Sequence, residues 1–79
     1  MAMQRQIIAV IQTVSTRKGA DPSPSQELFE TGILDSFELP DLVSALEKEF
    51  GVLIPDTDLR PKNFSSIEQI EKYLESRRH

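Results

Sequence analysis

Ser36 is the residue at which the chemistry of this chain has to be sought, because acidic and apolar neighbours surround it. Asp35 precedes it, and Phe37, Glu38 and Asp41 follow it at the start of an amphipathic stretch. A serine in such a place can cap a helix, attack a substrate as a nucleophile or accept a covalent group. Capping is the commonest role of a serine before a helix, and the other two roles have to be weighed against it.

The sequence offers Ser36 no partner for nucleophilic catalysis. The single histidine is His79, at the end of the chain, so a Ser-His-Asp triad is not expected. There is no cysteine, which excludes a disulfide framework, a thiolate metal site and a cysteine nucleophile, and which fits a reducing cytosol. Residues 56–58 (Asp-Thr-Asp) begin like a calcium loop, but residues 59–61 lack the further oxygen ligand and the glycine that such a loop needs. The sequence therefore indicates a protein without catalysis of its own.

Negative charge is concentrated around Ser36. Residues 27–58 hold nine acidic residues against Lys48 alone, a net charge of −8, whereas the rest of the chain is at +4. A field of this sign repels nucleic acid and attracts a basic patch on a protein partner. The alternative is that the acids only keep a small domain soluble. No apolar run approaches the length of a membrane span, so membrane insertion is not expected. We expect a cytoplasmic monomer that has protein partners and does not bind nucleic acid.

The spacing of apolar residues predicts a first helix from about Met3 to Val14. Its inward face is formed by five residues at helical intervals, Met3, Ile7, Val10, Ile11 and Val14. Arg17 and Lys18 supply a basic last turn, and Gly19 follows as a stop signal.

The segment between the first two helices is predicted to be a long loop. Residues 19–31 contain Pro22 and Pro24 among polar residues. Leu28 and Phe29 are too apolar to leave in water, so we expect them to fix the far end of the loop to the core, through a short helical turn that begins near residue 25.

A second helix is predicted to begin at Asp35 or Ser36, either of which can cap it, and to end at Gly51. Its apolar residues form one buried stripe: Leu39, Leu42, Val43, Leu46 and Phe50. Its opposite face presents five residues to solvent: Glu38, Asp41, Ser44, Glu47 and Lys48. Pro40 conflicts with a regular first turn that starts at Ser36 but is favoured at position N1. We therefore expect a distorted or delayed first turn, with Ser36 just outside the regular helix.

The last part of the chain completes an all-α bundle. Residues 52–55 are apolar and have no partner strand, so they are interpreted as a tether packed on the core, followed by a short helical turn at 56–59. Phe64 is a further core anchor, and Ser65 and Glu68 have the spacing of a capping box. The last helix should turn Ile67, Ile70 and Leu74 inward, with Tyr73 beside them. The expected fold is a single domain over residues 1–79, about 3–75 ordered and the ends frayed, with three main helices, one short helix and a long first loop.

Asp35-Ser36-Phe37 resembles the Asp-Ser-Leu attachment motif of the acyl carrier protein family, which includes the peptidyl and D-alanyl carrier proteins. The helix over 41–51 and the following Ile54-Pro55-Asp56 are also similar to these carriers, and the resemblance runs from about residue 28 to residue 74. The dipeptide alone is a weak signal, whereas its combination with the helix, the tether and the chain length is a strong one. The segment 32–37 (Gly-Ile-Leu-Asp-Ser-Phe) is more similar to D-alanyl and other specialised carriers than to carriers of fatty acid synthesis.

The resemblance implies that Ser36 carries 4′-phosphopantetheine, transferred from coenzyme A by a phosphopantetheinyl transferase, with Asp35 in a supporting role. The thiol of the arm would hold an acyl or aminoacyl group as a thioester, and the carrier would present it to biosynthetic enzymes of a specialised lipid, polyketide or cell-envelope pathway. The reactive sulfur would belong to the cofactor, so the carrier itself would be no enzyme. The phosphodiester would lie beside backbone N–H groups at the start of the second helix, with Asp35 and Glu38 pushing it outward.

The resemblance also implies a docking surface for the transferase and for acyl- or aminoacyl-loading enzymes with basic patches. The residues expected to form it are Phe37, Glu38, Asp41, Ser44 and Glu47. Phe37 has two interpretations, an exposed apolar contact beside the arm or a core residue that closes the mouth of the helix. The alternative function is a helical interaction module with a carrier fold but no arm, because Pro40 could distort the helix on which a transferase docks.

The identity of the cargo depends on packing that the sequence does not reveal. The side chains that decide it are Ile7, Leu42, Leu46, Ile54, Phe64 and Ile70. Room among them would favour a long acyl chain held inside the bundle, whereas tight packing would favour a short or polar cargo.

Overall fold

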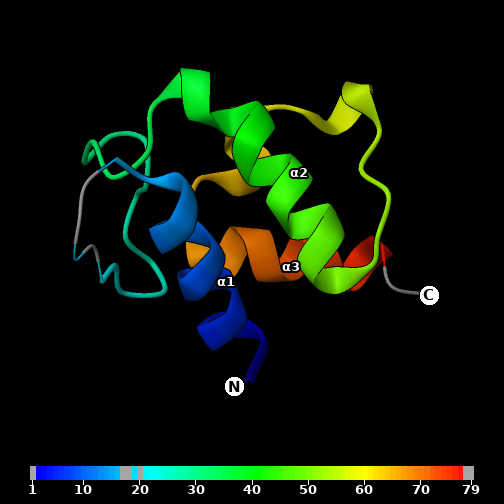
Figure 1. The fold of residues 1–79 in the computed structure, drawn as a ribbon, viewed down its shortest axis with the longest axis horizontal. Helices are drawn as coiled ribbons and strands as arrows, with labels where there is room; N and C mark the ends of the chain where they lie inside the picture. Colours follow the sequence, from blue (N-terminus) through cyan, green and yellow to red (C-terminus); the bar gives the residue numbers. More distant parts are fainter. Residues whose placement is uncertain (1, 17–18, 20, 78–79) are drawn as a thin grey trace.

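Three α-helices joined by loops and 3₁₀ turns make up the computed structural model, which describes residues 2–16, 19 and 21–77 (Figure 1). The helices are α1 (Ala2–Val14), α2 (Leu39–Phe50) and α3 (Ile67–Arg77). One 3₁₀ turn, η1 (Ser36–Glu38), leads into α2, and two more, η2 (Asp56–Asp58) and η3 (Pro61–Phe64), connect α2 with α3. The described residues contain no strand, and no helix among them is long and apolar enough to cross a membrane. The all-α prediction is confirmed, and the short helical turn expected at 56–59 is present as η2.

The core lies where the apolar stripes of the three helices meet. α1 and α2 pack against each other and α3 packs against α1. Each fully buried aliphatic or aromatic side chain stabilises such a core by roughly 1.5–3 kcal/mol. The large side chains with almost no exposed surface are Ile7, Ile11, Leu28, Leu34, Leu42, Leu46, Phe64, Ile67, Ile70 and Leu74.

Of the two outer helix ends, that of α1 agrees with the prediction and that of α3 does not. α1 ends at Val14, where the hydroxyl of Thr13 donates to the carbonyl of Val10 (2.7 Å), a bond that competes with the helical ladder. The basic last turn was expected at Arg17 and Lys18, which lie outside the described residues. α3 continues to Arg77, so fraying does not begin at residue 76, and residues 78–79 lie outside the described part of the chain.

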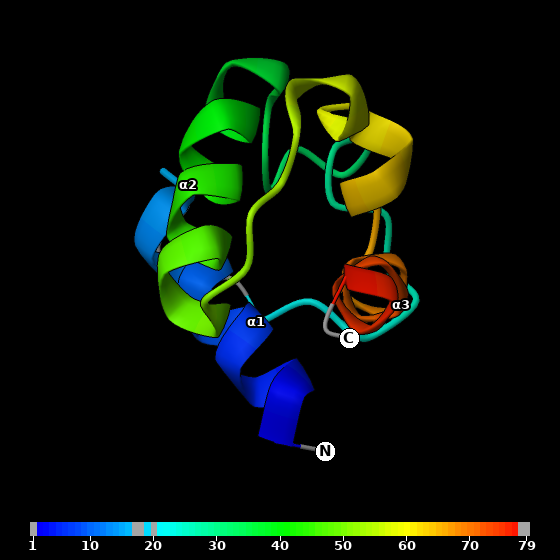
Figure 2. The same cartoon turned by 90° about the vertical axis from the view of Figure 1, so that its right-hand side faces the viewer.

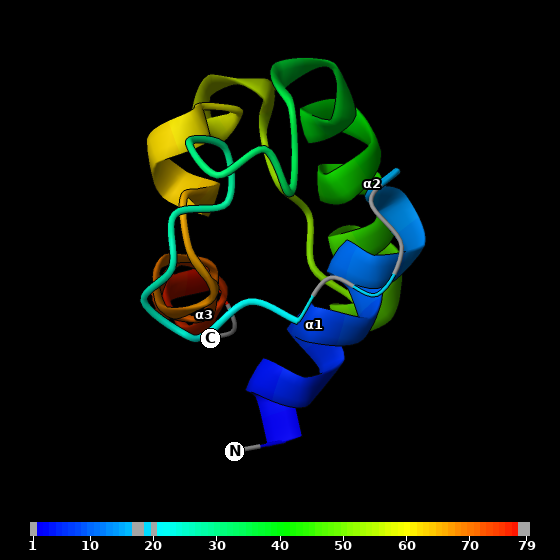
Figure 3. The same cartoon turned by 90° about the vertical axis from the view of Figure 1, so that its left-hand side faces the viewer.

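The loop that follows α1 is fixed to α3 rather than left in solvent (Figure 3). The N–H of Leu28 donates to the carbonyl of Ser65 (2.7 Å), and the N–H of Glu68 donates to the carbonyl of Pro24 (2.9 Å). Leu28 is fully buried, as expected. The helical turn predicted near residue 25 is wrong, because the chain there forms successive hydrogen-bonded turns instead.

On the other side of the molecule, residues 52–55 bridge α2 and the 3₁₀ turns as a tether (Figure 2). Gly51 ends α2 in the left-handed conformation (φ 65°), which glycine adopts without strain. Ile54 is buried, and its N–H donates to Oε2 of Glu47 (2.8 Å). The predicted tether is therefore confirmed, although its Leu53 is 82% exposed.

The start of α3 is capped by Ser66 and not by Ser65. Oγ of Ser66 accepts a hydrogen bond from the N–H of Gln69 (3.1 Å), whereas Oγ of Ser65 donates to the carbonyl of Lys62 (3.3 Å). The predicted capping box of Ser65 and Glu68 is thus wrong by one residue. The inward positions of Ile67, Ile70 and Leu74 and the half-buried Tyr73 are as predicted.

Candidate functional site

Ser36 is exposed and is the first residue of η1, at the end of α2 that Figure 1 shows farthest from the N-terminus. Asp35 has extended backbone angles (φ −113°, ψ 171°) and is the N-cap of this turn. Its Oδ1 accepts hydrogen bonds from the N–H groups of Phe37 (2.9 Å) and Glu38 (3.0 Å). The sequence allowed either Asp35 or Ser36 as the capping residue. In the structure Asp35 is the cap, and the hydroxyl of Ser36 is not used for capping.

Glu38 closes the same turn from its other end. It was expected in solvent, but only 9% of its surface is exposed, so that expectation is wrong. Its Oε1 accepts from the N–H of Asp35 (2.9 Å), and its Oε2 accepts from the N–H of Thr16 (3.1 Å), beyond the end of α1. Asp35 and Glu38 form a reciprocal capping box, in which each carboxylate accepts a hydrogen bond from the backbone N–H of the other residue. The Asp-x-x-Glu spacing that signals this arrangement was visible in the sequence and was missed.

The regular helix starts after the turn, as the position of Pro40 suggested. α2 begins at Leu39, whose N–H donates to the carbonyl of Ser36, and Pro40 occupies position N2, one residue later than the N1 position considered. A proline there loses no bond that a regular first turn would have made. The expectation of a delayed first turn, with Ser36 outside the α-helix, is confirmed.

These contacts occupy most of the backbone donors that follow Ser36 in η1 and at the start of α2. The N–H groups of Phe37 and Glu38 already donate to Asp35, that of Leu39 donates to the carbonyl of Ser36, and Pro40 has no N–H. The sequence suggested backbone donors around a phosphodiester, and in the structure those of Phe37, Glu38 and Leu39 already have acceptors. A group on Ser36 therefore faces solvent and the negative charge of Asp35.

The surface beside Ser36 combines an aromatic side chain with acids. Phe37 is 90% exposed, so the reading in which it closes the core is wrong. Asp41 and Ser44 are exposed on α2, as predicted. Glu47 is half-buried, because its carboxylate receives the N–H of Ile54. Of the residues predicted for docking, all except Glu38 thus reach the surface at least in part.

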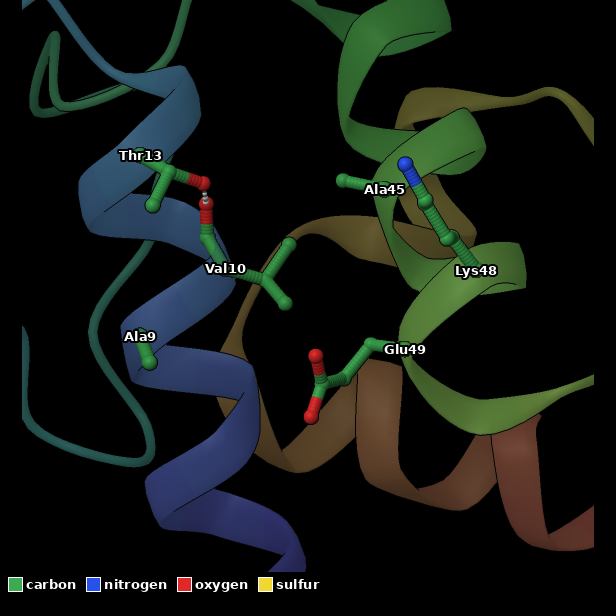
Figure 4. A pocket seen from close by; sticks show the side chains of 6 residues that line it. All are labelled: Ala9, Val10, Thr13, Ala45, Lys48 and Glu49. Carbon is green, nitrogen blue, oxygen red and sulfur yellow. Dashed lines mark hydrogen bonds between the residues drawn. The ribbon is translucent and has the colours of Figure 1, made fainter.

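Three surface hollows among the described residues lie away from Ser36. One of about 230 Å³ lies between α1 and α2, where Glu49 extends toward α1 and Lys48 lies higher on α2 (Figure 4). Two others are lined by residues of α3 and by residues of the first loop with η3. Among the described residues, no cluster of three or more His, Cys, Asp or Glu could hold a metal ion; His79 lies outside them. The exposed hydroxyl of Ser36 is open to modification by another protein.

Comparison with known proteins places this geometry in one family. Residues 5–74 match the family model described as the phosphopantetheine attachment site. The chain is 33% identical over 58 residues to the D-alanyl carrier protein of Bacillus velezensis, covering 73% of this chain and 74% of that protein. It is 33% identical over 81 residues to the acyl carrier protein of Thermotoga maritima, covering 98% of each.

A solved structure has the same fold. The crystal structure of Bradyrhizobium japonicum glycine:[carrier protein] ligase complexed with glycylated carrier protein contains a chain that superposes with a TM-score of 0.75. It is 30% identical, and the match covers 91% of this chain and 97% of that one. The chain therefore belongs to the acyl carrier protein family, and its cofactor is a covalently attached 4′-phosphopantetheine.

Proposed function

We propose that Ser36 is the residue to which the 4′-phosphopantetheine arm is attached, and that the chain presents acyl or aminoacyl groups to biosynthetic enzymes. The observation that carries this proposal is that Asp35 caps η1, so that Ser36 is not needed as the cap and stays exposed. A group attached there extends into solvent, so the residues fit the arm. When bound, the arm supplies the thiol that holds the cargo as a thioester.

The cargo that we favour is a short aminoacyl group. The relatives include D-alanyl carrier proteins and an aminoacyl carrier protein of Bradyrhizobium diazoefficiens. The packing supports the same choice, because the side chains named as decisive for a cavity belong to one buried cluster: Ile7, Leu42, Leu46, Ile54, Phe64 and Ile70. The three described hollows are lined by none of these six side chains. A short cargo needs no room among them.

The docking surface in this proposal consists of the exposed residues around the arm. Phe37 provides an apolar contact, Asp41 and Ser44 lie on the exposed face of α2, and Glu47 contributes from its half-buried position. Basic patches on the transferase and on the loading enzyme complement this surface, so association should weaken as salt is added. Glu38 is excluded as a direct contact by its burial.

The competing function, an interaction module without an arm, was motivated by Pro40. In the structure Pro40 lies at N2 of α2, where it fits the helix start without disrupting the face that a transferase would meet. The family match over residues 5–74 also favours a carrier over an armless module.

The experiment that tests the proposal is intact-mass analysis after incubation with coenzyme A, magnesium and a broad-specificity phosphopantetheinyl transferase. Wild type should gain one phosphopantetheine and Ser36→Ala none. Ser25→Ala, which alters another exposed serine in the first loop, should be modified like wild type. Both variants should unfold within about 0.5 kcal/mol of wild type, because neither change touches the core. Modification of Ser36→Ala would contradict the proposal. So would the absence of modification in every form of the protein, tested both with a transferase proven on another carrier and with a genome-matched transferase.

A further inference from the structure

We propose that Glu38 is a positioning residue for Ser36. Its buried carboxylate ties the serine-bearing turn to the segment that follows α1, and so holds the hydroxyl of Ser36 in the orientation in which the transferase receives it. The inference rests on the proposed attachment at Ser36, and it concerns how the bundle holds that residue.

The two oxygens of Glu38 join two segments that are distant in sequence. Oε1 accepts from the N–H of Asp35 (2.9 Å), immediately before the serine, and Oε2 accepts from the N–H of Thr16 (3.1 Å), 22 residues away from Glu38. A carboxylate loses hydration when it is only 9% exposed, and such burial is tolerated when its oxygens are hydrogen-bonded. Both oxygens of Glu38 are bonded, so the side chain is held in one place.

A second contact runs parallel to the first. Oγ of Ser15 donates to the carbonyl of Ile33 (2.5 Å), and Ile33 itself is buried. Residues 15–16 are thus hydrogen-bonded to the chain on both sides of the Asp35-Ser36 dipeptide. Ile33 is the partner before the dipeptide, and Glu38 is the partner after it. Ser36 has an exposed side chain on a backbone that is fixed at both flanks.

No apolar side chain of η1 itself is buried, and the nearest buried ones are Leu34 before the turn and Leu39 after it. Ser36 is exposed and Phe37 is 90% exposed, so the first side chain of the segment that enters the apolar core is Leu39. Asp35 and Glu38 are therefore the groups that hold the turn. A reacting hydroxyl displaced by about 1 Å can lower a transfer rate on the order of 100-fold, which gives the positioning a measurable consequence.

The test compares the rates at which coenzyme A and the transferase modify four proteins, followed by intact mass over a range of carrier concentrations. For Glu38→Ala we expect kcat to fall on the order of tenfold with KM nearly unchanged, since the hydroxyl is misplaced and the docking surface is intact. Glu38→Gln should be intermediate, because its amide oxygen can replace only one of the two acceptors. Ser66→Ala, which removes the cap of α3 and lowers stability away from Ser36, should keep the wild-type rate.

A readout independent of turnover is amide hydrogen exchange. The N–H groups of Asp35 and Thr16 should both exchange faster in Glu38→Ala than in wild type, at least one of them should do so in Glu38→Gln, and Ser66→Ala should not show this local change.

The outcomes separate the two proposals. A wild-type protein that is never modified overturns the attachment and the positioning together. Modification of both Glu38 variants at the rate of Ser66→Ala overturns the positioning alone and leaves the attachment at Ser36 standing. A rise in KM that depends on salt, with kcat unchanged, also overturns it, because Glu38 would then be a docking contact.

Discussion

The 3₁₀ turns at the two ends of α2 are held by opposite means. η1, before the helix, is fixed by the carboxylates of Asp35 and Glu38 bonded to backbone N–H groups, and it leaves Phe37 in solvent. Beyond the tether that follows the helix, η3 is fixed by aromatic burial, whereas η2 has no buried residue of its own. Phe64 is fully buried and meets the ring of Tyr73 edge-on, with ring centroids 5.4 Å apart.

The second region adds polar contacts to an apolar anchor. The hydroxyl of Tyr73 donates to Oδ2 of Asp58 (2.6 Å), and Nδ2 of Asn63 donates to the carbonyl of the same residue (2.9 Å). A side chain that must enter another protein cannot be held by burial, so its turn has to be fixed through the backbone. We therefore expect changes around Phe64 to affect stability and changes around Ser36 to affect modification.

Phe64→Ala should give the largest change in stability of the variants considered in this comparison. Removing a fully buried aromatic ring lowers the free energy of unfolding by about 3–5 kcal/mol, against a total on the order of 4–12 kcal/mol for a domain of this size. Urea unfolding followed by circular dichroism measures the loss. Where the variant is folded, Ser36 should still be modified at the wild-type rate. A loss below about 1 kcal/mol would show that this region does not anchor the fold.

Tyr73→Phe should have a smaller effect that depends on pH. Burial raises the pKa of Tyr73 from 10.0 to about 12, assisted by its hydrogen bond to Asp58 and by the negative charge of that residue. The folded state thus favours the neutral phenol, and this contribution to stability is complete below pH 10 and is lost as the pH rises from 10 to about 12.

The variant lacks both the hydrogen bond and this titration. At pH 7 we expect it to lose about 1 kcal/mol of unfolding free energy. Between pH 10 and about 12, wild type should lose stability faster than the variant, so the difference between them should shrink. Urea unfolding of both proteins across this range measures it, and a difference that stays constant would contradict the raised pKa.

The sequence predicted the features that depend on local periodicity. The inward faces of α1, α2 and α3 follow from apolar residues at helical spacing, and the delayed start of α2 follows from the fixed geometry of Pro40. The spacing of Asp35 and Glu38 indicates a capping box, but the burial of Glu38 also depends on the N–H of Thr16, which the fold brings near from a distant part of the chain.

The cap of α3 was predicted at the wrong residue because two neighbouring serines fit the same pattern. Ser65 and Ser66 both have an acidic or amide residue three positions later, and local patterns cannot choose between them. The choice is made by contacts with the first loop, whose Pro24 carbonyl receives the N–H of Glu68. For Phe37, burial and exposure were equally compatible with the sequence, and only the packed structure shows that its ring lies outside the core.

Phe37→Ala should give the smallest change in stability and is therefore the sharpest test of the difference between the two regions. Its matched control is Leu53→Ala, because Leu53 is 82% exposed on the tether and Phe37 is 90% exposed beside Ser36. Both variants should unfold within about 0.5 kcal/mol of wild type, since neither side chain belongs to the core.

Modification should separate the two variants. If Phe37 docks the transferase, Phe37→Ala should raise KM for the carrier by roughly 5- to 10-fold, the equivalent of about 1–1.4 kcal/mol of lost apolar contact. Leu53→Ala should leave KM unchanged. Equal KM values for the two variants would mean that exposure of an apolar side chain near α2 is not enough to define the docking surface. An effect confined to Phe37 would instead tie docking to the turn that the carboxylates of Asp35 and Glu38 hold in place.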